Sequence, residues 1–373
     1  MVCTTLIAGI AMAGEFQRGL EAFNSEDYDQ AMASWLPLAR AGDINAMYNV
    51  GLLYDEGLGV PVDKEAALDW YLVPAEEGDV SAQFNVAMIY DFGDGVPENN
   101  EKALYWYTEA ARQADELAQF NLAVMYATGE GVRVDMDEAI KWYKFSADLG
   151  HVPAQYNLAY IYDTGTGVPE DNQLAMQWYL KAADQGDDDA QYAIALMYDE
   201  GDGFAPDDLA AIKWYTLAAE QGNLRAQFNL AIMYDVGEGV PEDDAAAIRW
   251  YTAAADAGHA DAQLNLGVMY ENGEGTAADA SQAMHWYRRA ADQGSRDAQY
   301  AVALMFDEGI GMPEDNVAAL AWYARAAEQG DAQAQNNLGA MYDAGEGVPV
   351  DDERAVYWYE LSANQGNPIA QNN

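Results

Sequence analysis

The chain has 373 residues, and its 63 Asp and Glu against 17 Lys and Arg give a formal net charge of −46. Such a negative field repels nucleic acid and anionic membranes, and it favours basic partners or divalent cations. Cys3 is the only cysteine, which excludes an intrachain disulfide and zinc–thiolate sites.

Residues 1–13, MVCTTLIAGIAMA, carry no charge and are mostly apolar, and Ala11 and Ala13 form a small-x-small site. This pattern is typical of the end of a secretory signal peptide, so we expect a periplasmic or secreted protein. Because the segment has no basic start, a packed or disordered N-terminus and a cytoplasmic location stay open as alternatives. No other segment approaches the ~20 apolar residues that a membrane span requires.

Residues 14–43 predict a short helical hairpin that caps the N-terminal end of the array that follows. Ala31, Trp35 and Ala39 stand 36 residues before equivalent positions of the next segment. The glycine loop of the later segments is missing, and residues 24–27 predict a short turn in its place.

Residues 44–367 contain nine copies of one pattern at a period of 36 residues. A period in this range is typical of a stacked array of helical hairpins. Residues 368–373 begin a further copy. Since no linker interrupts residues 15–367, we expect one elongated domain. An early alanine of each copy recurs at Ala46, Ala82, Ala118, Ala154, Ala190, Ala226, Ala262, Ala298 and Ala334.

The sixth copy illustrates the first helix that each copy predicts. Ala226, Leu230, Met233 and Tyr234 fall on one stripe of a helix. Gly237 follows the stripe and is placed as a left-handed C-cap, which a residue without a Cβ adopts at no steric cost.

The second helix of the same copy begins after Asp243, whose carboxylate is placed to accept from free first-turn amides. Trp250 and Tyr251 precede alanines one turn later, which predicts large aromatic side chains packed into an alanine-lined hole. We therefore interpret these aromatics as core. The N-cap position is Asp or Asn in every copy: Asp63, Asn99, Asp135, Asp171, Asp207, Asp243, Asp279, Asp315 and Asp351.

The pattern A-Q-x-N-L-A/G-x-M-Y-D-x-G-x-G-V-P-x-D-x-x-x-A-x-x-W-Y-x-x-A-A-x-Q-G resembles the Sel1-like repeat, a relative of the tetratricopeptide repeat, over residues 44–373. The resemblance implies an all-α, right-handed α-α superhelix, a solenoid whose concave face is lined mainly by first helices. It also implies a scaffold or adaptor that binds a segment of another protein on that face, rather than an enzyme.

Rows of asparagine, acidic and aromatic residues follow the first helices at the repeat period. In relatives these positions face the concave side, and an amide there holds a peptide backbone through both its donor and its acceptor. Acidic and aromatic side chains suit Lys- or Arg-rich peptides through ion pairs and cation–π contacts. The candidate peptide-binding residues are Asn85, Asn121, Asn157, Asn229 and Asn265, Asp91, Asp163, Asp199 and Asp235, and Tyr156, Tyr192 and Phe228.

Each row also has a structural interpretation. The asparagines can bond a neighbouring helix terminus or turn, and the carboxylates can cap amides of the glycine loop. The acidity can equally reflect solubility in a salty environment, where ions screen repulsion. A calcium- or salt-stabilised array is a further alternative, with loops such as residues 91–98 supplying hard oxygen ligands.

Catalysis has little support in the sequence. His151, His259 and His285 lie in different copies without regular spacing, and no serine, zinc or phosphate-loop motif is present. His151 and His259 share one position just after a glycine, where we expect exposed loop residues. The sequence thus predicts a non-enzyme without cofactor or metal, with a weak hydrolytic enzyme as the remaining alternative.

Overall fold

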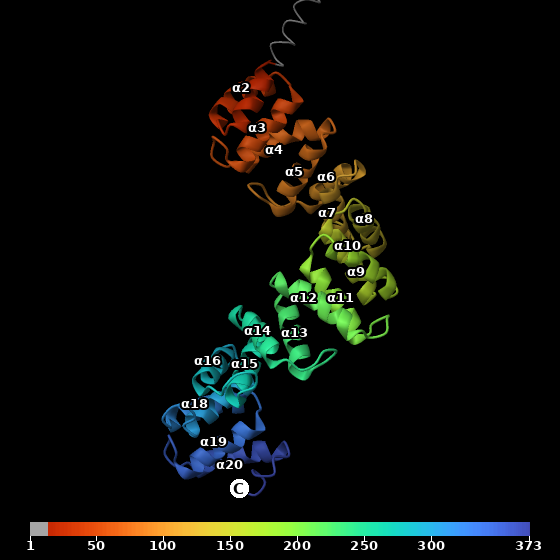
Figure 1. Ribbon diagram of the computed structural model, residues 1–373. Coiled ribbons are helices and arrows are strands. Elements are labelled where there is room, and N and C mark those ends of the chain that lie inside the picture. The colour runs from red at the N-terminus through yellow and green to blue at the C-terminus, as the bar shows by residue number, and fades with distance from the viewer. Residues whose placement is uncertain (1–13) are drawn as a thin grey trace, which may run out of the picture. The chain divides into compact units, whose positions relative to one another are not determined.

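The computed structural model describes residues 14–373, and within this range the chain forms helices joined by turns and loops, without a strand (Figure 1). The expected all-α fold is therefore confirmed. The signal-peptide-like segment predicted at residues 1–13 lies outside the described residues. None of the described helices is long and apolar enough to cross a bilayer.

The chain divides into two compact units, of which the first ends at Gln185 and the second begins at Gly186. The expectation of one elongated domain stays a prediction. The boundary falls in a turn between two helices where the 36-residue pattern continues, so composition gives no sign of it.

A helix over residues 14–24 precedes the helices labelled in Figure 1. Those of the first unit are α2 (Tyr28–Arg40), α3 (Ile44–Glu56), α4 (Lys64–Glu76), α5 (Val80–Phe92), α6 (Asn100–Arg112), α7 (Glu116–Thr128), α8 (Met136–Asp148), α9 (Val152–Thr164) and α10 (Asn172–Ala183). Those of the second unit are α11 (Asp188–Glu200), α12 (Asp208–Glu220), α13 (Leu224–Val236), α14 (Asp244–Asp256), α15 (Ala260–Asn272), α16 (Ala280–Asp292), α17 (Arg296–Asp307), α18 (Asn316–Glu328), α19 (Ala332–Ala344) and α20 (Asp352–Asn364).

Each repeat is one hairpin, made of an odd-numbered first helix from α3 to α19 and the even-numbered second helix that follows it. Within each unit, a first helix packs on the second helix of its own repeat and on that of the preceding repeat. No single hairpin can bury both of its faces, so the stack itself forms the core.

The helix ends follow from local sequence. In the sixth repeat, the carboxylate of Asp243 accepts from the N–H of Ala246 at 3.0 Å and begins α14, as predicted. The predicted glycine cap ends α13, because Gly237 has a φ of 71° and its N–H donates to the carbonyl of Met233. The other eight predicted Asp and Asn caps accept first-turn amides in the same way.

The second glycine of each loop lets the loop lie directly on the preceding repeat. Gly239 has a φ of 70°, and a Cβ built on it would lie 2.3 Å from the Cβ of Asp208 at the start of α12. Gly95 stands over Lys64 at the start of α4 in the same manner, at 2.7 Å. Both the positive φ and the close approach exclude a side chain here.

The tyrosine of each Trp-Tyr pair is the more deeply buried member. Tyr71, Tyr107 and Tyr215 are fully buried, and a Cβ on Gly51 would lie 2.7 Å from the ring of Tyr71. The other repeats have alanine or glycine at the position of Gly51, so a small residue on the first helix admits the ring. In the N-terminal hairpin, Gly19 meets Trp35 in the same way.

The tryptophans lie nearer the edge than the sequence pattern suggested. Trp106 and Trp322 remain 8% exposed, and Trp142, Trp214 and Trp250 are only partly buried. The interpretation of the pair as core holds fully for tyrosine and in part for tryptophan.

A row of buried glutamines ties successive hairpins together. Gln83 of α5 donates from Nε2 to the carbonyl of Ala75 at 3.0 Å, and its Oε1 accepts from Gln113 at 2.9 Å. The first bond adds a side-chain donor to a carbonyl at the C-terminal end of α4, which also accepts from the N–H of Gly78 at 3.1 Å. The same donation recurs from Gln119, Gln155, Gln227, Gln263, Gln299 and Gln335.

Candidate functional site

The acidic row near the ends of the first helices accepts hydrogen bonds from the buried tyrosines. Tyr215 donates from its hydroxyl to Oδ2 of Asp199 at 2.9 Å, across the hairpin of one repeat. A buried hydroxyl needs a partner, and a charged acceptor makes a strong one. Equivalent bonds join Tyr71 to Asp55, Tyr107 to Asp91, Tyr179 to Asp163, Tyr251 to Asp235, Tyr287 to Glu271 and Tyr323 to Asp307.

The asparagine row reaches the same hydroxyls from the next repeat. Asn229 of α13 donates from Nδ2 to the hydroxyl of Tyr215 at 3.1 Å. One unit therefore runs from an asparagine through a tyrosine hydroxyl to a carboxylate and spans two repeats. Asn265 and Asn337 donate to the hydroxyls of Tyr251 and Tyr323 in the same way. Asn85, Asn121 and Asn157 favour a lower pKa of Tyr71, Tyr107 and Tyr143, which places each amide beside the equivalent hydroxyl.

The gaps in the two rows do not coincide. Ala127 stands where Tyr143 would find a carboxylate, but Tyr143 keeps its bond to Asn157. The asparagine row has its own gap at Ala193, and Tyr179 is bonded to Asp163 at 3.1 Å. These buried hydroxyls thus keep at least one partner, which explains why each row tolerates a gap.

The aromatic row packs beside the same tyrosines. The ring centroids of Tyr192 and Tyr215 lie 5.8 Å apart, and those of Phe228 and Tyr251 lie 6.0 Å apart. Tyr156 packs on Tyr179 at 5.6 Å. The aromatic, asparagine and acidic candidates are all half-buried, so each contributes to the core and still presents part of its surface to solvent.

The repeat pattern predicts these rows but not the bonds between them. In the described residues, the partner recorded for Asp199 and Asp235 is a tyrosine hydroxyl and not a loop amide. A fixed offset was the available signal, because each tyrosine stands 16 residues after its carboxylate and 14 before its asparagine.

Burial raises the pKa of two carboxyls of the acidic row, Asp91 and Asp235. Burial raises the pKa of the Asp235 carboxyl above its ordinary value; the hydrogen bond from Tyr251 opposes the shift, and Glu274 and Asp244 add to it. The pKa of Asp91 is raised in the same way, chiefly by burial. Burial also raises the pKa of the Tyr251 hydroxyl, which keeps this group a neutral donor.

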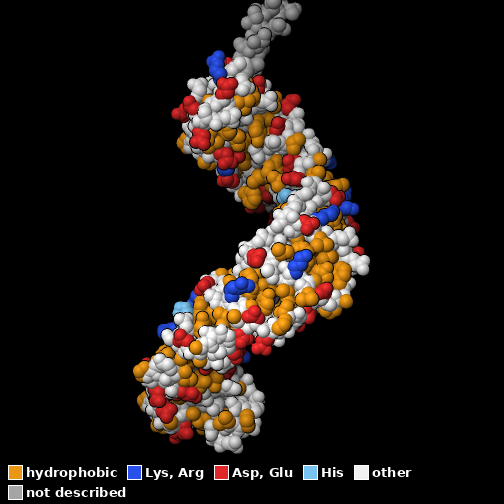
Figure 2. All heavy atoms as spheres, in the orientation of Figure 1, with side chains coloured by type: hydrophobic (Ala, Val, Ile, Leu, Met, Phe, Trp, Pro, Cys, Tyr) orange, Lys and Arg blue, Asp and Glu red, His pale blue; other side chains and the backbone are white. Residues whose placement is uncertain are grey.

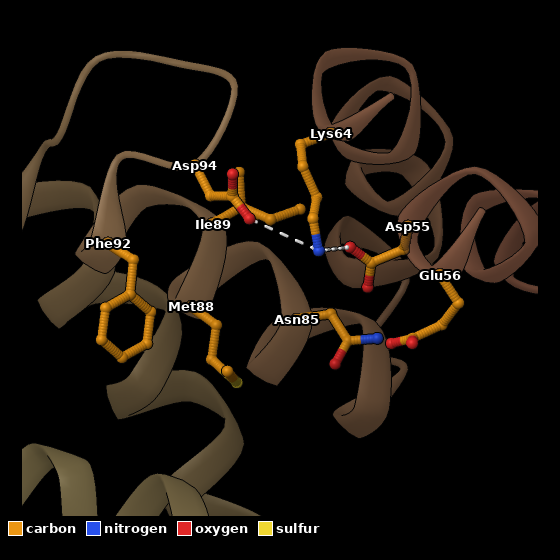
Figure 3. A pocket seen from close by; sticks show the side chains of 8 residues that line it. All are labelled: Asp55, Glu56, Lys64, Asn85, Met88, Ile89, Phe92 and Asp94. Carbon is orange, nitrogen blue, oxygen red and sulfur yellow. Dashed lines mark hydrogen bonds and ion pairs between the residues drawn. The ribbon is translucent and has the colours of Figure 1, made fainter. Parts of the chain in front are cut away.

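The row opens into a cavity between the first and second repeats (Figure 3). The cavity has a volume of about 190 Å³ and is lined by Asp55 of the acidic row and Asn85 of the asparagine row. The Nζ of Lys64 lies 2.7 Å from Oδ1 of Asp55 and 3.5 Å from Oδ2 of Asp94. The complete lining is Asp55, Glu56, Lys64, Asn85, Met88, Ile89, Phe92 and Asp94.

Basic residues are nearly absent from the first helices. Arg225 and Arg296 are the only Lys or Arg of α3 to α19 that lie on first helices, and both pair with neighbouring carboxylates, Asp189 and Asp297. On second helices several cations lie over tryptophan rings, as Lys181 does over Trp178 at 3.5 Å. Lys213, Arg249, Arg289 and Arg325 do the same.

The acidic side chains are spread along the visible face of each unit rather than gathered in one patch (Figure 2). Because the nine first helices carry so little positive charge, the field along them is negative at every repeat.

Two of the three histidines are helix caps and not exposed loop residues, which corrects the sequence-based expectation. His151 Nδ1 accepts from the N–H of Ala154 at 3.3 Å, and His259 Nδ1 accepts from the N–H of Ala262 at 3.3 Å. The His259 ring stacks on Phe228, and the His151 ring packs at a tilt against Phe120, each on the preceding first helix. Burial lowers the pKa of His151, and Glu116 opposes the shift.

Residues 14–373 contain no group of three or more His, Cys, Asp or Glu placed to hold a metal ion.

The segments that match a known protein family have nearly the same boundaries as the helical hairpins. A family model described as the Sel1 repeat matches nine consecutive segments, at residues 44–79, 80–115, 117–151, 152–187, 188–223, 224–259, 260–295, 296–331 and 332–367. A search of curated proteins finds no match.

Two solved structures are similar over most of the chain. The c5321 protein of uropathogenic Escherichia coli, described as a protective antigen with an SLR fold, is 35% identical, with a TM-score of 0.77 over 97% of this chain and 78% of its own. A Sel1 repeat protein from Oxalobacter formigenes is 36% identical, with a TM-score of 0.66 over 82% of this chain and 88% of its own.

Proposed function

Because this chain belongs to the Sel1 repeat family, whose members are protein-interaction scaffolds, we propose that it binds an extended, basic segment of another protein along its first helices. The proposed contacts are the half-buried asparagine, acidic and aromatic rows. The proposed role is an adaptor without catalysis, since the chain carries no catalytic-serine, zinc-binding or phosphate-loop motif. His151 and His259 serve as helix caps.

The unit formed by Asn229, Tyr215 and Asp199 carries this proposal. The Tyr215 hydroxyl donates to one oxygen of Asp199 and accepts one N–H of Asn229. These two bonds orient both side chains and use only part of their hydrogen-bonding capacity. The second carboxylate oxygen and the amide oxygen stay available to a ligand. A buried hydroxyl that orients exposed polar groups reduces the entropy lost on binding.

The distribution of charge supports a basic ligand. First helices carry carboxylates with almost no Lys or Arg, and several cations of second helices lie over tryptophan rings. A ligand that brings positive charge gains attraction at each repeat, and a chain of nine repeats multiplies this gain.

Photo-crosslinking tests the location of binding without breaking the hydrogen-bonded units. A benzoylphenylalanine placed at Tyr192 or Phe228, on first helices α11 and α13, is expected to crosslink one and the same partner in the native host. The matched control is Lys213, which is exposed on second helix α12 of the same unit.

Equal crosslinking from Lys213 would remove the first helices from the proposal. Competition by free oligolysine against the Tyr192 adduct, and none by oligoglutamate, is expected if the partner segment is basic.

We also propose that the protein is exported, on the basis of the uncharged apolar segment 1–13 and its Ala11-Met-Ala13 site. The prediction is a mature chain that begins at Gly14 in the periplasm or medium. Mass spectrometry of the native protein would contradict it by finding residues 1–13 retained in a cytoplasmic fraction.

A further inference from the structure

A cavity in the second unit lies between the start of α19 and residues 365–369. Its volume is about 600 Å³, which is within the range of small-molecule sites. None of its ten described lining residues carries a charge, although the chain has 63 acidic residues. We call it the amide cavity, because half of the lining residues have side-chain amides: Gln333, Asn336, Asn337, Gln365 and Asn367.

The equivalent cavity one repeat earlier is smaller and charged. It has a volume of about 370 Å³, and its lining includes Arg296, Asp297, Tyr300 and Asp331. The residues at the same positions of the amide cavity, 36 residues later, are Ala332, Gln333, Asn336 and Asn367. The two cavities thus use the same positions of the repeat, and the residue types at these positions account for the absence of charge. The loss of the aromatic ring at position 336 goes with the larger volume.

Hydrogen bonds hold the amides of the cavity in place. Asn336 is only 8% exposed, and its Nδ2 donates to Oδ1 of Asn337 at 3.2 Å. Asn337 donates in turn to the hydroxyl of Tyr323 at 3.0 Å. The Nδ2 of Asn367 donates to the carbonyl of Ala332 at 3.2 Å. A side-chain amide has two donor hydrogens and two acceptor lone pairs, so each of these groups keeps capacity for a ligand. Amides that are oriented in advance reduce the entropy lost on binding.

Apolar groups form another part of the lining. The half-buried ring of Tyr300 lines the cavity together with Pro368 and Ile369, and Ile369 is 61% exposed. A sugar ring matches this combination, because its C–H groups pack on apolar side chains and each of its hydroxyls both donates and accepts.

We propose that the amide cavity binds a neutral saccharide. A Lys- or Arg-rich segment gains no ion pair here, since no described carboxylate lines the cavity. A neutral ligand is not repelled by the net charge of −46. An uncharged peptide main chain offers one donor and one acceptor per residue, whereas one sugar ring presents several hydroxyls to the five amides at once. The inference goes beyond the docking of a basic segment and does not depend on it.

Saturation-transfer NMR of the full chain with neutral trisaccharides tests this inference. The probes are maltotriose, cellotriose and triacetylchitotriose, and at least one of them is expected to bind. Trigalacturonate, which carries three carboxylates, is expected not to bind, because the field of the protein is negative.

Asn336→Tyr is expected to weaken binding of that trisaccharide at least about tenfold, because it removes an amide and fills the cavity. Tyr192 and Tyr300 occupy the same position of their repeats, so the array accommodates a tyrosine there. The matched control is Leu264→Tyr, which places the same ring at the equivalent position two repeats earlier and should leave binding unchanged.

Gln333→Ala is a second variant that leaves the core intact, since Gln333 is exposed. It is expected to weaken binding about fivefold, the effect of losing one hydrogen bond, without a change in Tm.

Three results would overturn the inference. They are no binding of any neutral trisaccharide by the wild-type chain, equal binding by the Asn336→Tyr and Leu264→Tyr variants, or displacement of the sugar by the neutral peptide acetyl-Gly-Asn-Gly-amide at a lower concentration than the sugar itself requires. The last result would assign the cavity to a peptide. The proposed function is tested separately, because crosslinking of the native partner at Tyr192 and Phe228 does not involve the amide cavity.

Discussion

At the scale of single residues, two glutamines of the buried row lack the donor that the other repeats supply. Gln227 Oε1 and Gln119 Oε1 are buried without a hydrogen-bond partner. The donor expected for each stands 30 residues later, as Gln113 does for Gln83, but those positions hold Ala257 and Leu149. An unpaired buried acceptor costs stability that a paired one does not.

Ala257→Gln is therefore expected to stabilise the protein by about 1 kcal/mol, the usual net value of a hydrogen bond. The new amide would donate to Gln227 Oε1, as Gln221 does to Gln191 at 2.8 Å. Denaturant unfolding of the purified protein measures the change.

Ala245→Gln, at an exposed position of the same helix α14, controls for the general effect of exchanging alanine for glutamine. If the two variants are equally stable, the unpaired Oε1 of Gln227 has no energetic cost, and the interpretation of the glutamine row is wrong.

At the scale of the helix, each end is set within a few residues of sequence, and this is why the ends were predicted well. Asp243 and Gly237 act through bonds to residues three or four positions away. The bond from Asn229 to Tyr215 instead depends on how two hairpins pack, and residue types alone do not give that geometry. The role of His151 was missed for another reason, since imidazole is an unusual N-cap.

The cap of α9 makes its stability depend on pH. His151 Nδ1 can accept the amide of Ala154 only while the imidazole is neutral, and a positive ring at a helix N-terminus is unfavourable. Burial lowers the pKa of His151 in the folded chain, so the unfolded chain takes up the proton first. The contribution of the His151 cap to the free energy of unfolding is complete above the ordinary histidine pKa of about 6.5, and it declines as the pH falls below that value.

His151→Asn provides the comparison, because Asn223 caps α13 in the same array and does not titrate. The two proteins are expected to have similar stability at pH 8, and the variant should gain up to about 1 kcal/mol relative to wild type at pH 5. The nearby acidic groups, Glu116 among them, are present in both proteins and cancel in the difference. A difference that does not change with pH would show that the imidazole does not act as the cap.

At the scale of the whole molecule, repulsion between like charges lowers the stability of the stacked repeats. A net charge of −46 on 373 residues places like charges on every repeat, and the ion pairs of the described residues are few and mostly exposed. The repeat pattern predicted the hairpins and the rows, but it did not reveal the division at Gln185, because the pattern continues unchanged there.

Added salt should therefore stabilise the chain through screening alone. We expect Tm to rise steadily from low salt to about 0.5 M NaCl, because the screening length falls below the spacing of neighbouring repeats. CaCl₂ and MgCl₂ at equal concentration should raise Tm equally, since the described residues hold no three-ligand metal group that would select calcium. A calcium effect several degrees larger than that of magnesium, reversed by a chelator, would restore the calcium-stabilised array and contradict screening as the cause.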